Sequence, residues 1–277
     1  MKERAIILFF LLCLLITGGA RLPMRTIALR TPPYPFQPGE KIFYKMNYSI
    51  FTVGKAEIVF NPVIYNLKGK KCYKIDVNGR TAGAAQLVST VNDNWGTLMD
   101  SARLLPIQSW RNLQEGNYRR REFVDFNQET KEINVRVLDN KTGRFKDPKI
   151  YTFKTAEMRD LVSGYLFLRV IDFNHLSVGD TIAVNGFLED SFYNFRIMYE
   201  GIEKVETKLG YIRAYKLVPI MPDNKIFAGE NSITAWVSAD RLQIPIKIEA
   251  RMFIGRAGCE ITGMENTRYE PHYTKEE

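Results

Sequence analysis

Basic side chains gather in one stretch of the chain, residues 101–154, which holds twelve Lys or Arg and seven Asp or Glu. If residues 118–126 form a strand, Arg119 and Arg121 share a face, because side chains alternate along a strand. Arg111, on the preceding strand, could join them. Guanidinium groups bind phosphate and carboxylate, so these three residues are candidate binding residues for an anionic ligand. The alternative is a solubilising face with ion pairs across strands.

Motifs of common catalytic sites are missing from the sequence. It contains no G-x-G-x-x-G, G-x-x-x-x-G-K-[ST], G-x-S-x-G, H-E-x-x-H or C-x-x-C pattern. The two histidines, His175 and His272, fall in a turn and in the C-terminal tail, where a general base is not expected. We therefore predict no catalytic residues, no metal site and no cofactor.

Acidic residues leave one enzymatic alternative open, since a glycan hydrolase can work with two carboxylates alone. Glu189 and Asp190 are adjacent, so a strand would direct them to opposite faces. Most other acids alternate with Lys or Arg, as on a solvated sheet face. The balance favours a non-enzymatic protein, and the alternative is a secreted carboxylate-dependent hydrolase acting on glycan or peptide.

The first twenty residues have the layout of a signal peptide. Lys2 and Arg4 precede an apolar run at residues 5–16, and small residues follow up to Ala20. At about 1.5 Å per residue the run spans about 18 Å, which is less than the ~30 Å core of a bilayer. Cys13 lies inside the run, so lipid modification is not expected. We expect cleavage after Ala20, export to the periplasm or beyond, and no stable transmembrane anchor.

Removing this segment takes +1 from a net charge of +8 and leaves +7 on the mature chain, with two cysteines. In an oxidising compartment Cys72 and Cys259 could form a disulfide. Separate buried thiols are favoured, because the sequence does not show that the two residues lie within reach of each other. Nucleic acid is not an expected partner outside the cytoplasm, and no recognition motif supports it.

The mature chain is expected to form a single domain. Residues 21–39 contain five prolines and predict an extended leader. Residues 40–265 form a mainly β domain without an internal repeat, and residues 266–277 form a polar tail. Period-two alternation predicts strands at residues 40–50, 56–60, 73–77, 95–99, 107–113, 118–126, 133–137, 150–153, 193–199, 211–217 and 244–254. Asn61-Pro62 and Asn78-Gly79 are expected to end two of them.

One segment, residues 157–169, has apolar side chains at steps of three and four and predicts an amphipathic helix with Thr155 as its N-cap. Asp160 and Arg169 suit the helix dipole at its two ends. About a dozen strands in one sheet must curl. The predicted fold is therefore mainly β, a strongly curved antiparallel sheet or open barrel-like structure with one principal α-helix at about 157–169.

Several segments together resemble the DUF3108 family of uncharacterised exported bacterial proteins. They are Pro38-Gly39-Glu40-Lys41 with Tyr44, Gly54, Asp160-Leu161-Val162-Ser163 with Tyr165 and Leu168-Arg169, Val178-Gly179-Asp180, Trp236-Val237-Ser238-Ala239-Asp240, Ile244-Pro245-Ile246-Lys247 and Gly255. The resemblance implies a mainly antiparallel β protein of the bacterial envelope, without known catalytic residues. Ala239 stands where the family pattern has a second acid, which weakens the idea of a paired-Asp site.

Tyr165, Arg169 and Trp236 fall in these segments and complete the set of candidate binding residues. The alternative is that they hold the helix in the concave side of the sheet, with Trp236 packed against it. The sequence thus predicts a non-enzymatic envelope protein that binds a lipid-like or anionic envelope component, or docks a protein partner. Whether the helix fills the concave side or leaves it hollow decides between a carrier and other binding modes.

Overall fold

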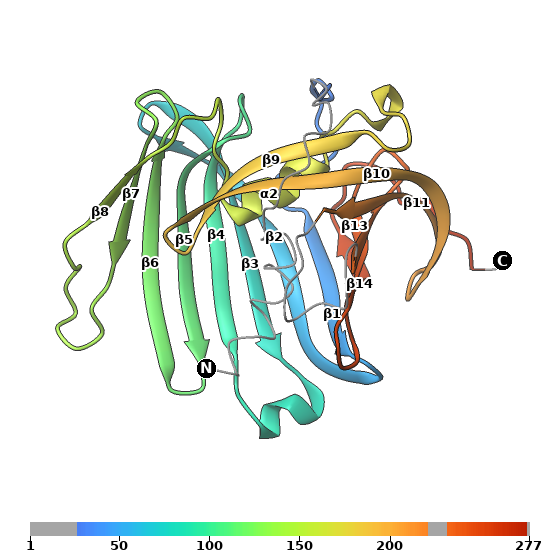
Figure 1. The fold of residues 1–277 in the computed structure, drawn as a ribbon, viewed down its shortest axis with the longest axis horizontal. Helices are drawn as coiled ribbons and strands as arrows, with labels where there is room; N and C mark the ends of the chain where they lie inside the picture. The colour runs from blue at the N-terminus through green and yellow to red at the C-terminus, as the bar shows by residue number, and fades with distance from the viewer. Residues whose placement is uncertain (1–26, 221–231, 276–277) are drawn as a thin grey trace.

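The fold is taken from a computed structural model that describes residues 27–220 and 232–275, so the predicted signal peptide lies outside the described residues. Fourteen antiparallel strands form one continuous sheet that curls strongly without closing (Figure 1). A short α-helix lies in the concave side. The predicted fold, an open and strongly curved β structure with one principal helix, is confirmed.

The strands are longer and more numerous than the sequence pattern suggests. They are β1 (Lys41–Tyr48), β2 (Phe51–Leu67), β3 (Lys70–Thr81), β4 (Asn92–Asp100), β5 (Pro106–Glu115), β6 (Tyr118–Asn127), β7 (Glu132–Val137), β8 (Lys149–Thr152), β9 (Thr181–Leu188), β10 (Ser191–Thr207), β11 (Gly210–Pro219), β12 (Ile233–Ser238), β13 (Pro245–Arg251) and β14 (Arg256–Glu265). The helical elements are η1 (Gly83–Leu87), α2 (Leu161–Leu168) and η2 (Phe173–His175).

The sheet consists of two meanders joined by the first and last strands. Its order is β8-β7-β6-β5-β4-β3-β2-β1-β14-β13-β12-β11-β10-β9, with β1 hydrogen-bonded to β14. The two edges are therefore β8 and β9. The chain passes from one edge to the other through α2, which brings the helix across the concave side (Figure 1).

Three predicted strand ends are wrong. β2 continues past Asn61-Pro62 to Leu67, because a bulge between Phe60 and Ile64 accommodates the proline. β3 passes through Asn78-Gly79, since both residues are paired with neighbours on β2 and β4. The strand predicted over residues 244–254 stops at Arg251, and the next residues form a turn in which Gly255 has φ +76°.

The helix is shorter than predicted and is not amphipathic. It starts at Leu161, capped by Asp160, whose carboxylate accepts hydrogen bonds from the backbone N–H groups of Val162 (2.8 Å) and Ser163 (3.1 Å). Thr155 is not the cap. The residues before the helix are not helical: Arg159 is extended and forms a β-bridge with Gly186 on the edge strand β9. This bridge covers part of that sheet edge. Six of the eight helical residues are buried, so the helix is an internal element of the core.

The concave side is filled by the helix and its neighbours. We call this face of the sheet the helix face, and it carries Ile42, Tyr44 and Ile58, all buried in the main core with Leu166. The opposite face, which we call the outer face, carries Lys45 and Lys55. Among the described residues, α2 and its neighbours therefore occupy the helix face, and the two pockets next to α2 measure about 30 and 20 Å³.

The packed unit extends beyond residues 40–265 at both ends. Phe36, in the predicted leader, is 2% exposed and stacks on Phe60 with ring centroids 5.0 Å apart. In the predicted tail, Thr274 pairs with Tyr211 through two backbone hydrogen bonds of 2.7 and 3.0 Å. These described parts of the extended leader and of the polar tail are thus docked on the domain.

The two described cysteines are separate free thiols, of which Cys72 is buried and Cys259 is half-buried. Cys72 lies on β3 and Cys259 on β14, with β2 and β1 between them in the sheet. Burial raises the pKa of the Cys259 thiol to about 12, with a smaller contribution from Glu260. This thiol therefore stays protonated and weakly reactive at neutral pH.

Candidate functional site

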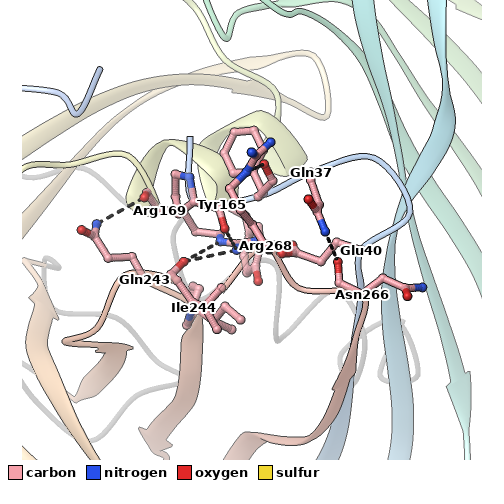
Figure 2. A network of polar contacts seen from close by, with 12 residues as sticks. Gln37, Glu40, Tyr165, Arg169, Gln243, Ile244, Asn266 and Arg268 are labelled. Carbon is pink, nitrogen blue, oxygen red and sulfur yellow. Dashed lines mark hydrogen bonds and ion pairs between the residues drawn. The ribbon is translucent and has the colours of Figure 1, made fainter. Parts of the chain in front are cut away.

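Arg169, a candidate binding residue, is a buried structural cation at the end of α2. Its guanidinium pairs with Glu40, just before β1, and both side chains are fully buried (Figure 2). It also donates to the carbonyl oxygens of Pro35 (3.2 Å) and Leu242 (3.2 Å). Burial alone lowers the pKa of Arg169, but the Glu40 carboxylate more than offsets this, so the group remains charged. We call the Arg169–Glu40 pair with these two carbonyls the arginine lock.

Tyr165 joins the same network one turn earlier on the helix. Its hydroxyl lies 2.9 Å from that of Tyr44 on β1, and Tyr44 donates to the carbonyl oxygen of Pro245 (2.8 Å). Burial raises the pKa of both tyrosines. Both hydroxyls are therefore neutral and hydrogen-bonded inside the core, which fits a structural role.

A loop shaped by Asp240 presents the carbonyl that Arg169 uses. The Asp240 carboxylate accepts from the Ser238 hydroxyl (2.7 Å) and from the backbone N–H groups of Leu242 (3.0 Å) and Gln243 (3.2 Å). Gln243 in turn donates to the carbonyl oxygen of Arg169 (3.2 Å). The helix end is thus held from two sides by this loop (Figure 2).

Arg111 does not join Arg119 and Arg121, contrary to the expectation from the sequence. Strand alternation places it on the helix face, opposite Glu122 of β6. It is 4% exposed and pairs with Glu122 (2.7 Å) and Glu189 (2.9 Å), above the ring of Trp95. Its charge is satisfied by these two carboxylates, so it offers no free cation to a ligand.

Trp236 does not pack against the helix. In the sheet Trp236 stands opposite Lys216 and Lys247. Its neighbour Val237 points to the other face, opposite Tyr215, and Tyr215 stacks on Phe173 just after the helix. The indole N–H donates to Glu203 (2.5 Å). Trp236 therefore lies under charged side chains on the outer face, far in the sheet order from Arg119 and Arg121.

Arg119 and Arg121 are exposed and share the outer face, as predicted. The strand register brings further cations into line with Arg119. It pairs Lys45 with Lys55, Lys55 with Arg80, and Arg80 with Asn92, and it continues through Gln114 to Arg119. We call Lys45, Lys55, Arg80 and Arg119 the cation row.

The cation row crosses six neighbouring strands, β1 to β6. At about 4.8 Å per strand it extends over about 24 Å. Arg121 stands one row further along β6, opposite Asn112. A row of this length matches a ligand with several anionic groups better than a single small ion.

Carboxylates do not neutralise the cation row. Within residues 27–220 and 232–275, Lys45, Lys55, Arg80 and Arg121 form no ion pair, and Arg119 donates to the carbonyl oxygens of Gly116 (2.6 Å) and Tyr118 (2.8 Å). At the end of the row, Glu260 is opposite Lys45 but accepts from the backbone N–H of Lys208 (2.6 Å). Like charges placed directly opposite each other destabilise a sheet, so the fold retains an electrostatic cost here.

A cleft of about 700 Å³ lies over the same part of the outer face. Lys45, Lys55 and Arg80 line it with Phe43, Asn78 and Asn92. The cavities beside the helix are far smaller, about 30 and 20 Å³. The outer face thus holds a larger recess than those beside the helix, and cations and amides line it together with Glu57.

The hydrolase alternative requires two carboxylates at one recess. Among the described residues that line the outer cleft, Glu57 is the one carboxylate, and Asn78 donates to it (3.0 Å). The same described ranges contain no group of three His, Cys, Asp or Glu residues that could hold a metal ion. In the part of the chain that the structure describes, no helix is long and apolar enough to cross a membrane.

Sequence reasoning missed Lys45, Lys55 and Arg80 as site residues. Alternation did assign Lys45 to the polar face of its strand, but the basic stretch at residues 101–154 drew attention to the later strands. The cation row depends on the register of five strand pairings, and register is not written in local composition.

Comparison with known proteins assigns the chain to a family. The profile of the family described as "Protein of unknown function (DUF3108)" matches residues 44–262, so the chain belongs to this family. Some of the segments that carry the resemblance lie at or beside the arginine lock: Glu40 and Arg169 form its ion pair, Tyr44 and Tyr165 share a hydrogen bond, and Asp240 accepts from the Leu242 N–H. These residues of the chain hold the helix in the sheet. Among curated proteins, no relative is found for this chain.

Three solved structures are similar to this chain, each at 9% sequence identity. A β-barrel-like protein of domain of unknown function DUF1849 from Brucella abortus has a TM-score of 0.50 over 86% of this chain and 99% of its own. A candidate exported protein with a YmcC-like fold from Bacteroides fragilis scores 0.33 over 84% and 98%. A candidate lipoprotein from Parabacteroides distasonis scores 0.29 over 84% and 97%. The first of these shows the β-barrel-like fold alone.

Breaking the arginine lock should destabilise the protein strongly. Arg169→Met leaves the Glu40 carboxylate buried without a partner, and Glu40→Gln leaves the Arg169 guanidinium buried without one. Each substitution should lower the free energy of unfolding by about 3–5 kcal/mol. Urea denaturation followed by circular dichroism measures this. Glu129→Gln, which removes the exposed Lys70–Glu129 pair (3.0 Å), is the control and should cost less than about 1 kcal/mol. Equal losses for both pairs would contradict a special role of the lock.

Removing charge from the cation row should stabilise the fold. Lys55 faces Lys45 on one side and Arg80 on the other, so Lys55→Gln should raise the free energy of unfolding by about 0.2–1 kcal/mol. The gain should shrink at high salt, because screening already weakens the repulsion. Lys71→Gln, at an exposed site opposite Asn66, is the matched control and should change little. A destabilised Lys55→Gln would show that the row contributes to folding.

Proposed function

We propose that this protein is an exported envelope protein that binds an anionic component of the bacterial envelope, without catalysing a reaction. The ligand chemistry is a set of phosphate or carboxylate groups on an extended molecule, such as a phosphorylated glycan. The observation that carries this proposal is the cation row, which keeps unpaired charges side by side on neighbouring strands.

The cation row lowers the stability of the fold but favours the binding of an anionic ligand. Exposed like charges across a sheet weaken the fold, and such a cost is retained most readily where a bound ligand offsets it. An anionic ligand lying along the row would replace repulsion with charge-assisted hydrogen bonds. The amides of Asn78 and Asn92 in the cleft would supply further donors.

Other basic residues support the outer face as the binding region. Arg111, Arg159 and Arg169 are each at most 4% exposed and have acidic partners, so they are committed to the core. The exposed Arg121 lies next to the cation row and would extend it towards a longer ligand. The cavities beside the helix offer too little room for a lipid tail.

The proposal of export is supported by the signal-peptide layout of residues 1–20 and by the resemblance to the DUF3108 family of exported proteins. We expect protein from the periplasmic fraction of its bacterial host to begin at Arg21, as intact-mass spectrometry would show. Protein that keeps residues 1–20, or that stays in the cytoplasmic fraction, would contradict export. Replacing Leu11 and Leu12 with Arg should trap the precursor, because it breaks the apolar run.

Binding can be tested with deacylated lipopolysaccharide oligosaccharide, a soluble probe that carries phosphates and carboxylates but no acyl chains. Isothermal titration calorimetry should detect binding that weakens as salt is raised. The variant Lys45→Gln/Lys55→Gln/Arg80→Gln should bind at least about tenfold more weakly, because three cations facing the ligand are lost.

A matched control removes the same charge elsewhere. Lys141, Arg144 and Lys146 are exposed in the β7–β8 connection, and Lys141→Gln/Arg144→Gln/Lys146→Gln should bind as the wild type does. Dextran, a neutral glycan, should not bind. An equal loss of affinity in both triple variants would show that net charge alone determines binding. Absence of binding by the wild-type protein would contradict the proposal.

A further inference from the structure

Three loops at one end of the sheet expose large apolar side chains. They are the β1–β2 turn, the η1 loop after β3 and the β13–β14 turn, which are blue, teal and red towards the lower edge of Figure 1. Their exposed residues form what we call the tip patch: Ile50 (88% exposed), Phe51 (62%), Leu87 (91%), Val88 (81%), Phe253 (65%) and Ile254 (80%).

Hydrogen bonds to backbone carbonyl groups hold the three loops together. The Ser49 N–H donates to the Arg256 carbonyl oxygen (2.6 Å), and the Tyr48 hydroxyl donates to that of Ile254 (2.5 Å), so the first and third loops adjoin. The Ala82 N–H donates to the carbonyl oxygen of Val53 (3.0 Å), which fixes the η1 loop beside β2. The tip patch is therefore one feature of the tertiary structure, built from three distant parts of the chain.

Together the three loops of the tip patch carry basic side chains and no acidic ones. Residues 48–54, 82–90 and 251–257 contain no acid, and the third loop carries Arg251 and Arg256, both exposed. The cation row begins directly behind the loops, since Arg80 is next to the last residue of β3 and Lys55 is the fifth residue of β2. On the adjoining β5–β6 turn, Glu115 pairs with Val91 through the backbone and Arg119 follows.

Apolar tips with a collar of cations match the two layers of a membrane surface. Aliphatic and aromatic side chains enter the boundary between headgroups and acyl chains, and Lys or Arg near the surface are attracted by anionic lipids. A protein partner would be expected to meet a flatter patch with a polar rim of both signs. Three separate hairpin and loop tips without an acid therefore favour an anionic bilayer as the occupant.

We propose that the tip patch inserts into the surface of an anionic membrane, with the cation row at the level of the lipid phosphates. This inference rests on the proposed function, because the same cations bind the anionic groups, and it assigns their source to lipid headgroups. The sheet would then stand on the bilayer with its strands steeply inclined to the surface, since all three loops lie at strand ends.

Vesicle sedimentation tests this placement with mature protein. We expect binding to vesicles of phosphatidylethanolamine and phosphatidylglycerol, and little binding to phosphatidylcholine alone. The variant Ile50→Ser/Phe253→Ser/Ile254→Ser should partition onto the anionic vesicles at least about tenfold more weakly. Its affinity for the soluble deacylated oligosaccharide should be unchanged, because the cation row is intact. These side chains are exposed, so the thermal unfolding curve should also match that of the wild type.

The control variant Val63→Ser/Ile150→Ser/Val178→Ser removes apolar residues of similar exposure (56%, 65% and 71%) away from the tip patch and should bind vesicles normally. Vesicle binding that is insensitive to the tip substitutions would overturn the inference, and it would leave the proposed function intact if the soluble oligosaccharide still binds. Concentration-dependent dimers of the wild type that the tip substitutions abolish would overturn it in favour of a second copy of the chain. If the wild type bound anionic vesicles and not the oligosaccharide, a phosphorylated glycan would be excluded as the ligand, and lipid headgroups would remain as the source of the anionic groups, as the inference states.

Discussion

The buried ion pair between Arg169 and Glu40 is the interaction on which the arrangement of this fold depends. Two opposite charges without solvent contact are stable only when their geometry is good and the remaining donors are satisfied. Here the carbonyl oxygens of Pro35 and Leu242 supply those acceptors. The pair joins three places far apart in the chain: the segment just before β1, which supplies Pro35 and Glu40, the end of α2, and the loop before β13.

Filling the helix face changes where function can reside. A curved sheet offers a concave side for a ligand, but here α2, Phe36 and the aromatic residues around them occupy that side. Several residues that carry the resemblance to the DUF3108 family, among them Glu40, Tyr165 and Arg169, lie in this packing. The unpaired cations of the cation row lie on the outer face instead.

The outer face combines features that are unfavourable for stability alone. Like charges stand opposite each other in the cation row, and six large apolar side chains are exposed at the adjacent end. Both features are unfavourable on a surface that contacts only water, because like charges repel each other and exposed apolar side chains are poorly hydrated. Their proximity gives them a common explanation, since a membrane presents anionic groups and an apolar layer within a few ångströms of each other.

The sequence by itself determined the fold class and most element positions, because period-two alternation and the single helical segment are local signals. It also identified Arg119 and Arg121 as exposed cations. Only the tertiary structure decided that Arg111 and Arg169 are buried in ion pairs, that Trp236 faces away from the helix, and that Lys45, Lys55 and Arg80 align with Arg119. The physical reason is register: which residues stand opposite each other depends on pairings between distant strands, where bulges shift the count by a residue or more, and no local pattern records those shifts.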